Sequence, residues 1–391
     1  MSMMAYSGGT GTEENPYLIS SKADLLELKT NIEDGITTEG VHFLLTEDIT
    51  GIITPICGLF SGTFDGGGHI MDVNMNVTNI NAGIFQKLQN ATIKNLGVTG
   101  NINATRTTNS VQIDVGSICG IMENSTITNC FNTADITYTS SIIQSAVGSL
   151  GGICGEMRIT TSKFNLIENC FNKGTINIIN VPTSHIGGIC GYITLFDCMI
   201  KNCYNTGNIY GNTVSSYFVY SCGIAAGVGF MTSNAGEIKN CFAANTEIEK
   251  QGFRIGGRTA ITTNCYALAS MWVNGNRISS TEVTSENGRD TEKNYFRDQE
   301  WVEDNLRWDF NAVWTMSDIN SEFEGFPILK WQETREIENA VKNTTVEKEV
   351  QRIEYFGIDG KLAPQGISGV FIKKITYTDN TTEIKKIIQI K

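Results

Sequence analysis

The sequence predicts an all-β chain folded as a parallel β-helix, and three observations support that prediction. Two short phrases recur through the middle of the chain, and successive copies of their shared Asn are 24 to 40 residues apart. The repeated units are rich in Ile, Thr, Asn and Gly, and alternating runs such as residues 175–178 are typical of short strands. Gly and Asn between the runs indicate tight turns. One such coil cannot bury its apolar face alone, but a stack of coils can.

The two phrases are Gly-Gly-Ile-Cys-Gly, found at 151–155 and 187–191, and Ile-x-Asn-Cys-Phe/Tyr-Asn, found at 127–132, 167–172 and 200–205. Equivalent strands of neighbouring coils lie ~4.8 Å apart, so equivalent residues form columns. We expect the Asn column to be a structural ladder at a bend, because Asn tolerates left-handed backbone and its amide can bond its neighbours in the stack. The predicted columns are Asn95, Asn129, Asn169, Asn202 and Asn240, and Cys130, Cys170, Cys203 and Cys241.

The eleven Cys are expected to be buried free thiols that act as small apolar side chains. Their number is odd, there is no C-x-x-C, and stacked neighbours would point the same way, which is poor geometry for a disulfide. Zinc needs convergent ligands, and the three His (His42, His69 and His185) are scattered. We therefore expect neither a metal nor another cofactor.

The repeats resemble the GLUG-type repeats of bacterial cell-surface and adhesin-like proteins. The resemblance is carried by Gly-Gly-Ile-Cys-Gly followed by Ile-x-Asn-Cys-Phe/Tyr-Asn-x-Gly-x-Ile, and it covers about residues 83–250. It implies a right-handed β-helix and an extracellular interaction role, and it implies no catalytic residues.

Residues 1–37 are expected to form an N-terminal cap. Residues 21–24 resemble a capping box, and apolar spacing predicts a helix over 22–33 that covers the open end of the stack. The run Asp-Gly-Gly-Gly-His that follows, from Asp65 to His69, has two interpretations. It is either an acid–base pair or a Gly-rich turn in which Asp65 bonds its own backbone, and we favour the turn.

The predicted β-helix spans residues 1–335, with GLUG-like repeats over 83–266. All five Trp lie between 272 and 331, so residues 271–331 are expected to form a C-terminal cap. Residues 336–350 are charged without apolar periodicity, which indicates a linker. Three strand-like runs predict a small antiparallel β domain over 351–391. This last segment resembles the C-terminal sorting domains of Bacteroidetes secreted proteins, which implies export.

Longer excursions recur at one point of each repeat, at 103–115, 137–150, 177–186 and 210–221, and such insertions often form a binding face. Aromatic side chains of the last excursion are candidates for contact with a glycan or an extracellular protein, although they could instead pack back onto the stack. The candidate binding residues are Tyr210, Tyr217, Phe218 and Tyr220.

These features favour a non-catalytic, adhesin-like binding protein at the cell surface or secreted, and most simply a monomer. The alternatives are a purely structural scaffold and a β-helical carbohydrate-active enzyme, either a polysaccharide lyase or a hydrolase. That chemistry needs close carboxylates or calcium-binding acids, and no local motif supplies them. The net charge of −12 argues against nucleic acid. No stretch has the length of a membrane span, and no signal peptide begins the chain, so we expect contact with a membrane only through anchoring and removal of an export signal.

Overall fold

The computed structural model describes most of the chain. The described residues are 6–109, 112–142, 148–158, 164–180, 184–193, 197–212, 219–228, 236–249, 251–257, 260–333, 350–356, 369–377 and 382–389. Two compact units divide the chain, residues 1–332 and residues 333–391. The chain is mostly β with parallel sheets, as the sequence predicts. Among the described residues, no helix is both long and apolar enough to cross a membrane.

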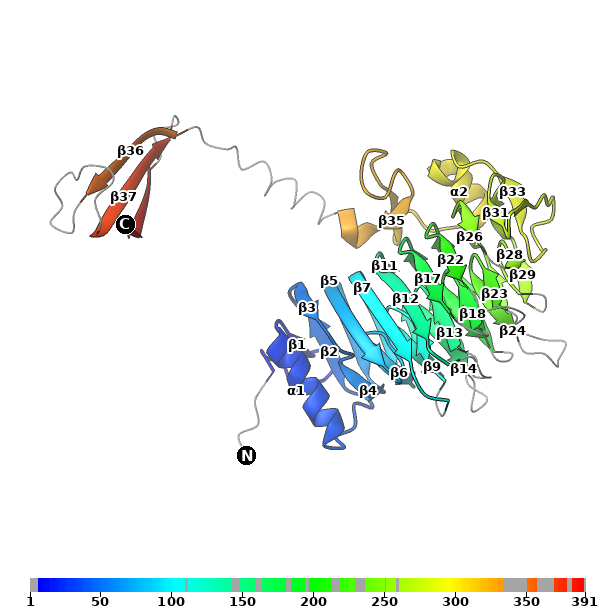
Figure 1. Cartoon of the computed structure of the whole chain (residues 1–391), viewed down its shortest axis with the longest axis horizontal. Helices are drawn as coiled ribbons and strands as arrows, with labels where there is room; N and C mark the ends of the chain where they lie inside the picture. The colour runs from blue at the N-terminus through cyan, green and yellow to red at the C-terminus, as the bar shows by residue number, and fades with distance from the viewer. Residues whose placement is uncertain are drawn as a thin grey trace. The chain divides into compact units, whose positions relative to one another are not determined.

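The first unit contains three sheets in which equivalent strands of successive repeats pair in parallel (Figure 1). The five-stranded sheet consists of β8 (Asp114–Val115), β13 (Gly148–Gly151), β18 (Ser184–Gly187), β23 (Val219–Cys222) and β28 (Gly252–Phe253). The six-stranded sheet consists of β4 (Cys57–Phe60), β6 (Phe85–Gln89), β9 (Cys119–Glu123), β14 (Cys154–Arg158), β19 (Cys190–Ile193) and β24 (Ala225–Val228).

The third and largest sheet collects the remaining repeat strands, and all its pairs are parallel except β31 with β32. Its strands are β1 (Tyr17–Ile19), β2 (His42–Leu45), β3 (Ile49–Ile52), β5 (Thr63–Thr78), β7 (Thr92–Arg106), β10 (Thr126–Thr128), β11 (Phe131–Asn132), β12 (Asp135–Ser140), β15 (Asn165–Glu168), β16 (Phe171–Asn172), β17 (Ile176–Ile179), β20 (Cys198–Lys201), β21 (Tyr204–Asn205), β22 (Ile209–Asn212), β25 (Glu237–Lys239), β26 (Phe242–Ala243), β27 (Glu247–Ile248), β29 (Ile261–Thr263), β30 (Tyr266–Leu268), β31 (Trp272–Val273), β32 (Asn276–Arg277) and β33 (Arg289–Thr291).

Register places identical residues of successive repeats beside one another. Ile127 pairs with Ile167, Ile167 with Ile200, and Ile200 with Ile238, and all four side chains are fully buried. The ten Cys whose side chains the structure describes are buried free thiols. The repeated apolar residues of the sequence therefore form a continuous core that extends through successive repeats.

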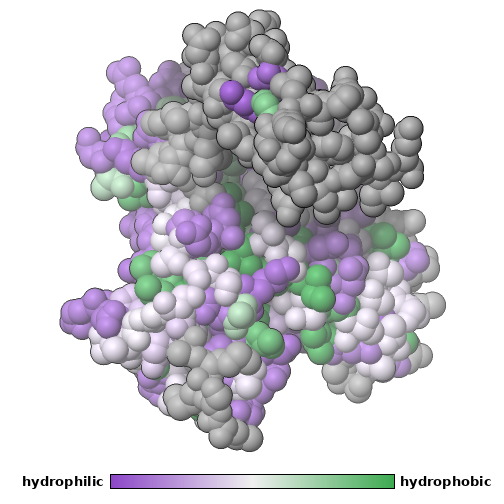
Figure 2. All heavy atoms as spheres, turned by 90° about the vertical axis from the view of Figure 1, so that its left-hand side faces the viewer, coloured by the Kyte–Doolittle hydropathy of each residue, from purple (hydrophilic) through white to green (hydrophobic). Residues whose placement is uncertain are grey.

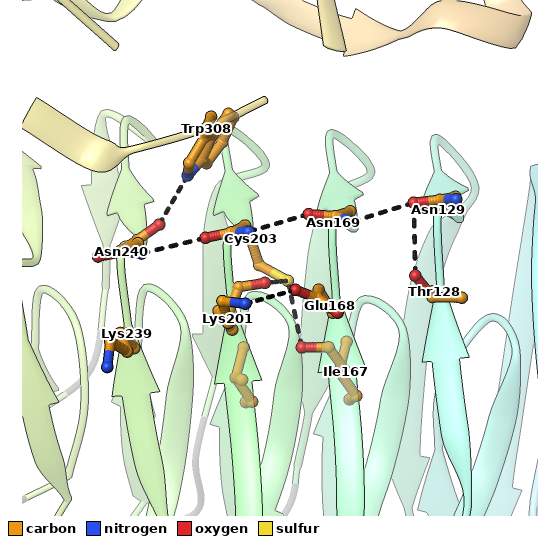
Figure 3. Close-up of polar contacts among 12 residues, drawn as sticks. Thr128, Asn129, Ile167, Glu168, Asn169, Lys201, Cys203, Lys239, Asn240 and Trp308 are labelled. Carbon is orange, nitrogen blue, oxygen red and sulfur yellow. Dashed lines mark hydrogen bonds and ion pairs between the residues drawn. The ribbon is translucent and has the colours of Figure 1, made fainter. Parts of the chain in front are cut away.

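The Asn of the second phrase lies at a bend with left-handed backbone, with φ between 52° and 54° from Asn95 to Asn240. Each amide nitrogen donates to the side-chain oxygen of the Asn one repeat earlier, at 3.4 Å for Asn129 to Asn95. The distance is 3.2 Å for Asn169 to Asn129 and 3.1 Å for Asn202 to Asn169, and Figure 3 shows this part of the ladder. Asn240 continues the series to Asn202 at 3.3 Å. Each Asn thus serves two purposes, because it permits the bend and links neighbouring repeats.

The N-terminal helix α1 (Lys22–Glu33) begins at Ser21, whose side chain accepts a hydrogen bond from the backbone of Asp24. The Asp24 carboxylate accepts a hydrogen bond from the backbone nitrogen of Ser20 at 3.0 Å, one residue before the position that a capping box would use. Leu25 and Leu28 are buried beneath the helix. Figure 2 views the molecule from this side and shows hydrophobic residues interspersed with hydrophilic ones.

The aromatic residue of the second phrase also forms a column. Phe131, Phe171, Tyr204 and Phe242 stack with ring centroids 4.8 to 5.2 Å apart. These rings are buried, so something outside the repeats must cover them.

The Trp-rich segment provides that cover. It includes η1 (Tyr295–Arg297), α2 (Gln299–Leu306), β34 (Trp314–Met316) and β35 (Pro327–Leu329). Trp308 Nε1 donates to the backbone oxygen of Asn240 at 2.9 Å, and Trp331 Nε1 donates to that of Asn129 at 3.2 Å (Figure 3 shows Trp308). The segment predicted as an end cap therefore runs back along the side of the stack, because the outward-facing aromatic column needs burial.

The second unit contains an antiparallel sheet of β36 (Val350–Phe356), β37 (Gly369–Tyr377) and β38 (Thr382–Gln389). These strands lie within the stretch where the sequence predicts a small antiparallel β domain.

Candidate functional site

Aligning the repeats on the Ile of the first phrase reveals a column of polar residues four positions earlier. The column runs through Asp114, Ser149, His185 and Tyr220, which are register partners in β8, β13, β18 and β23. Side chains that share a register position project to the same side of a sheet. Four different polar side chains from four repeats therefore lie in one row.

A second column runs beside the first, seven residues later in each repeat. It contains Ile121, Glu156 and Tyr192, which are register partners in β9, β14 and β19. The His185 and Tyr192 rings lie 4.4 Å apart between centroids, so the two columns touch.

The last Gly of the first phrase allows this close approach. A Cβ at Gly155 would lie 2.5 Å from the Gly120 carbonyl oxygen and 2.6 Å from the Val115 nitrogen. Gly191 is equally confined, 2.4 Å from the Leu150 nitrogen. A larger residue at either position would push the two columns apart.

Two carboxyl groups meet where the columns touch. Gln112 Nε2 donates to Asp114 Oδ1 at 3.0 Å and to Glu156 Oε2 at 3.3 Å, so a single amide bridges the acids. Asp114 is 1% exposed and Glu156 is 3% exposed, whereas Gln112 is exposed. The pair thus lies directly beneath the surface, under one long polar side chain. We call Gln112, Asp114, Ser149, Glu156, Arg158 and His185 the Asp114 cluster.

Arg158 makes the two acids unequal. Its guanidinium holds Glu156 with two bonds, from Nη2 at 2.5 Å and from Nε at 3.1 Å, but it lies 3.9 Å from Asp114 Oδ2. The bond with Glu156 raises the pKa of Arg158. Burial and the nearby Glu156 charge raise the pKa of Asp114 to about 7, against the opposing effects of Gln112 and Arg158.

Ser149 and His185 complete the cluster. Ser149 donates its backbone N–H to Asp114 Oδ1 at 3.2 Å. Within the described part of the chain, Ser149 Oγ and His185 Nδ1 are buried atoms without a hydrogen-bond partner. Burial lowers the pKa of His185 to about 4, so the imidazole is neutral at neutral pH.

The predicted binding residues are only partly brought to this site. Tyr220 joins the first column, with its ring 6.1 Å from that of His185. Tyr210 lies elsewhere, on β22 of the largest sheet, where its hydroxyl accepts a bond from Asn208 at 2.9 Å. Tyr217 and Phe218 lie outside the described residues.

Asp65 and His69 do not form an acid–base pair. Asp65 accepts a hydrogen bond from the backbone of Gly67 at 2.9 Å, as the Gly-rich turn requires, and pairs with Lys94 at 3.2 Å. His69 Nδ1 lies instead 3.2 Å from Asp48.

Over the ranges that the structure describes, no group of three or more His, Cys, Asp or Glu could hold a metal ion.

The chain resembles proteins of known fold. The family model for the GLUG motif matches residues 183–210, which include His185. A candidate immunoglobulin A1 protease from Bacteroides ovatus superposes with a TM-score of 0.61 at 21% identity, over 83% of this chain and 95% of that one. A structure named IgA1 protease superposes with a TM-score of 0.50 at 16% identity, over 91% of this chain and 29% of that one. No curated protein matches.

These comparisons contradict the expectation of a non-catalytic, adhesin-like protein, because both solved structures bear the name of a protease. The alternative of a polysaccharide lyase or hydrolase is an enzyme, but of a different type. At 21% and 16% identity the likeness establishes the fold. The assignment of a function depends on the residues of this chain.

Proposed function

We propose that this chain hydrolyses peptide bonds, with Asp114 as the acid and Glu156 as the base. One observation carries the proposal: two buried carboxyl groups from different coils are bridged by a single Gln112 amide. Carboxyl pairs held in unequal environments are the arrangement by which one site supplies both an acid and a base.

The two acids suit different roles. Asp114 has its pKa raised to about 7, so it holds a proton over much of the neutral range and can donate it to a substrate carbonyl or leaving group. Glu156 is held by the Arg158 guanidinium through two hydrogen bonds, which fix the position of its carboxyl group. An ionised carboxylate can take a proton from an attacking water.

Gln112 occupies the position where that water would stand, because its amide nitrogen contacts both carboxyl groups. The residue is exposed, so its side chain can turn outward without displacing the core. When the Gln112 side chain turns outward, it would leave a space between the Asp114 and Glu156 carboxyl groups that solvent can enter.

The substrate class that we propose is an extracellular polypeptide. Both similar structures carry the name of an immunoglobulin A1 protease, and immunoglobulin A1 is a protein. The GLUG motif, together with these neighbours, supports a secreted or surface location. The segment resembling a sorting domain, residues 351–391, fits the same route of export.

The architecture that fits these contacts is a right-handed parallel β-helix. Three sheets of register-matched parallel strands support it, as do the identical residues that recur at each level. This architecture explains how residues 35 positions apart, such as Asp114 and Ser149, become neighbours.

The test is hydrolysis of an unbiased peptide mixture by the full chain, followed by mass spectrometry. We expect new termini with the parent chain and a loss of at least ~100-fold in rate with Asp114→Asn or Glu156→Gln. Glu168→Gln is the matched control, because Glu168 also pairs with a cation, Lys201 at 2.8 Å, but lies on β15 of the largest sheet (Figure 3). Equal rates in all four proteins would overturn the proposal.

A further inference from the structure

We propose that Ser149 is the nucleophile of this site and that His185 is its base, so that hydrolysis passes through an acyl group on Ser149. The inference rests on the proposed function and deepens it. It names the side chain of the Asp114 cluster whose oxygen bonds to the peptide carbonyl carbon during hydrolysis.

The register of the strands brings the two side chains together. Ser149 on β13 and His185 on β18 are Cα partners in adjacent parallel strands, which places them ~4.8 Å apart along the stack. Both project to the same side. Over the described residues, neither Ser149 Oγ nor His185 Nδ1 has a hydrogen-bond partner, although both are buried, so the proposed proton transfer requires one of the two side chains to turn toward the other. A buried hydroxyl and a buried ring nitrogen without partners carry a free-energy cost, and here the two lie at paired register positions.

Another buried serine shows what is particular to Ser149. Ser221 Oγ is also buried and lacks a partner in the described ranges. Its register partners are Ile186 and Gly252, neither of which can accept a proton. Ser149 has an imidazole on one side and a carboxyl group on the other.

Asp114 and Ser149 are fixed relative to each other by the bond from the Ser149 backbone nitrogen to Asp114 Oδ1. When Asp114 is protonated, its O–H can donate to the oxygen of the attacked carbonyl. A neutral buried acid in this role stabilises the developing negative charge without adding a charge of its own.

The proposed reaction balances within the cluster and one water. The Ser149 Oγ–H proton moves to His185 Nδ1 as Oγ bonds to the peptide carbonyl carbon. The C–N bond then breaks, and the leaving amine takes the proton from His185. Water attacks the resulting ester, giving one proton to Glu156. That proton passes to Ser149 Oγ as the acid product leaves.

Access depends on the outermost side chains of the cluster. Ser149 is fully buried and His185 is 8% exposed, whereas Gln112 is exposed and the Arg158 side chain is 36% exposed. Gln112 and Arg158 are therefore the side chains of the cluster that a reagent meets first. Small electrophiles should reach the hydroxyl before large ones do.

The experiment is to incubate the full chain with a small alkyl fluorophosphonate, which phosphonylates activated serines, and to map the adduct by mass spectrometry. We expect one adduct on Ser149, at a rate at least ~100-fold lower in His185→Gln and unchanged in Ser221→Ala. No adduct on Ser149, or equal labelling of the parent and His185→Gln, would overturn the inference.

Peptide hydrolysis by Ser149→Ala separates this inference from the proposed function. Loss of hydrolysis in Ser149→Ala and in Asp114→Asn, but not in Ser221→Ala, supports both. Hydrolysis retained by Ser149→Ala and lost by Asp114→Asn overturns the nucleophile while leaving the acid–base pair in place. Hydrolysis unaffected by Asp114→Asn overturns the proposed function itself.

Discussion

Asp114 and His185 should make opposite contributions to the pH dependence of stability. The pKa of Asp114 is raised to about 7, so between pH 4 and 7 the folded chain keeps a proton that the unfolded chain has lost. Asp114 therefore makes stability fall as pH rises through this window. The pKa of His185 is lowered to about 4, so between pH 4 and 6.5 the unfolded chain holds a proton that the folded chain lacks. His185 therefore makes stability rise with pH.

The two contributions are of similar size. From pH 4 to 6.5, each amounts to about 2.5 pKa units, or at most ~3 kcal/mol at 1.36 kcal/mol per unit. Because they have opposite signs, they nearly cancel in the parent chain. Asp114→Asn should remove the falling contribution and make stability rise by up to ~3 kcal/mol from pH 4 to 6.5, relative to the parent. His185→Gln should do the reverse.

The assay is urea unfolding at pH 4, 5 and 6.5, followed by tryptophan fluorescence. All five Trp lie between residues 272 and 331, within the segment that covers the stack, so the emission reports on the first unit. Subtracting the stability of the parent at each pH removes the contributions of the other acidic groups, which the variants share with the parent. Parallel pH profiles for the parent and both variants would refute the reasoning, since they would mean that neither group titrates abnormally when folded.

Three further substitutions test the stack itself. Ile200→Asp places a charge in a fully buried column and should destabilise the first unit by more than ~4 kcal/mol, seen as loss of the β signal in circular dichroism; a parent-like melt would contradict the coil assignment. Asn169→Ala removes two ladder hydrogen bonds at a residue with φ 54° and should cost ~1–3 kcal/mol in urea unfolding. Gly155→Ala should cost ~1–3 kcal/mol, because its Cβ would lie 2.5 Å from the Gly120 oxygen; an unchanged melting temperature would show that the two columns do not need this approach.

Much of the fold could be predicted because the same pattern of apolar residues, Asn and Gly recurs in successive repeats. Identical residues at one position, such as Ile167 and Ile200, have one arrangement that buries them all, which is a stack. Helix α1 was predictable from its cap, since Ser21 and Asp24 are adjacent in sequence to the turn that they stabilise.

The path of the Trp-rich segment could not be predicted in the same way. The sequence shows that Phe171 and Tyr204 are equivalent, but not that their rings face outward and need cover. That cover comes from contacts such as Tyr204 Oη to the Pro327 backbone oxygen at 2.7 Å, across 123 residues. No local pattern encodes a contact over such a separation.

The candidate site was missed for a different reason. Asp114, Ser149 and His185 are different residue types. Repeats that are recognised by identical residues therefore do not reveal that these three occupy the same position. A search for chemically different polar residues at one repeat position would have found them. Gln112, which bridges the acids, falls in an excursion between repeats and could not be placed without coordinates.

The central claim is that a protonated Asp114 acts as the acid beside Glu156, and the pH dependence of kcat/KM for peptide hydrolysis tests it most directly. With the pKa of Asp114 raised to about 7, we expect the rate to fall as pH rises above neutrality, because the acid loses its proton. A rate that keeps rising from pH 7 to 9 would contradict the account, because it would mean that hydrolysis proceeds with Asp114 ionised.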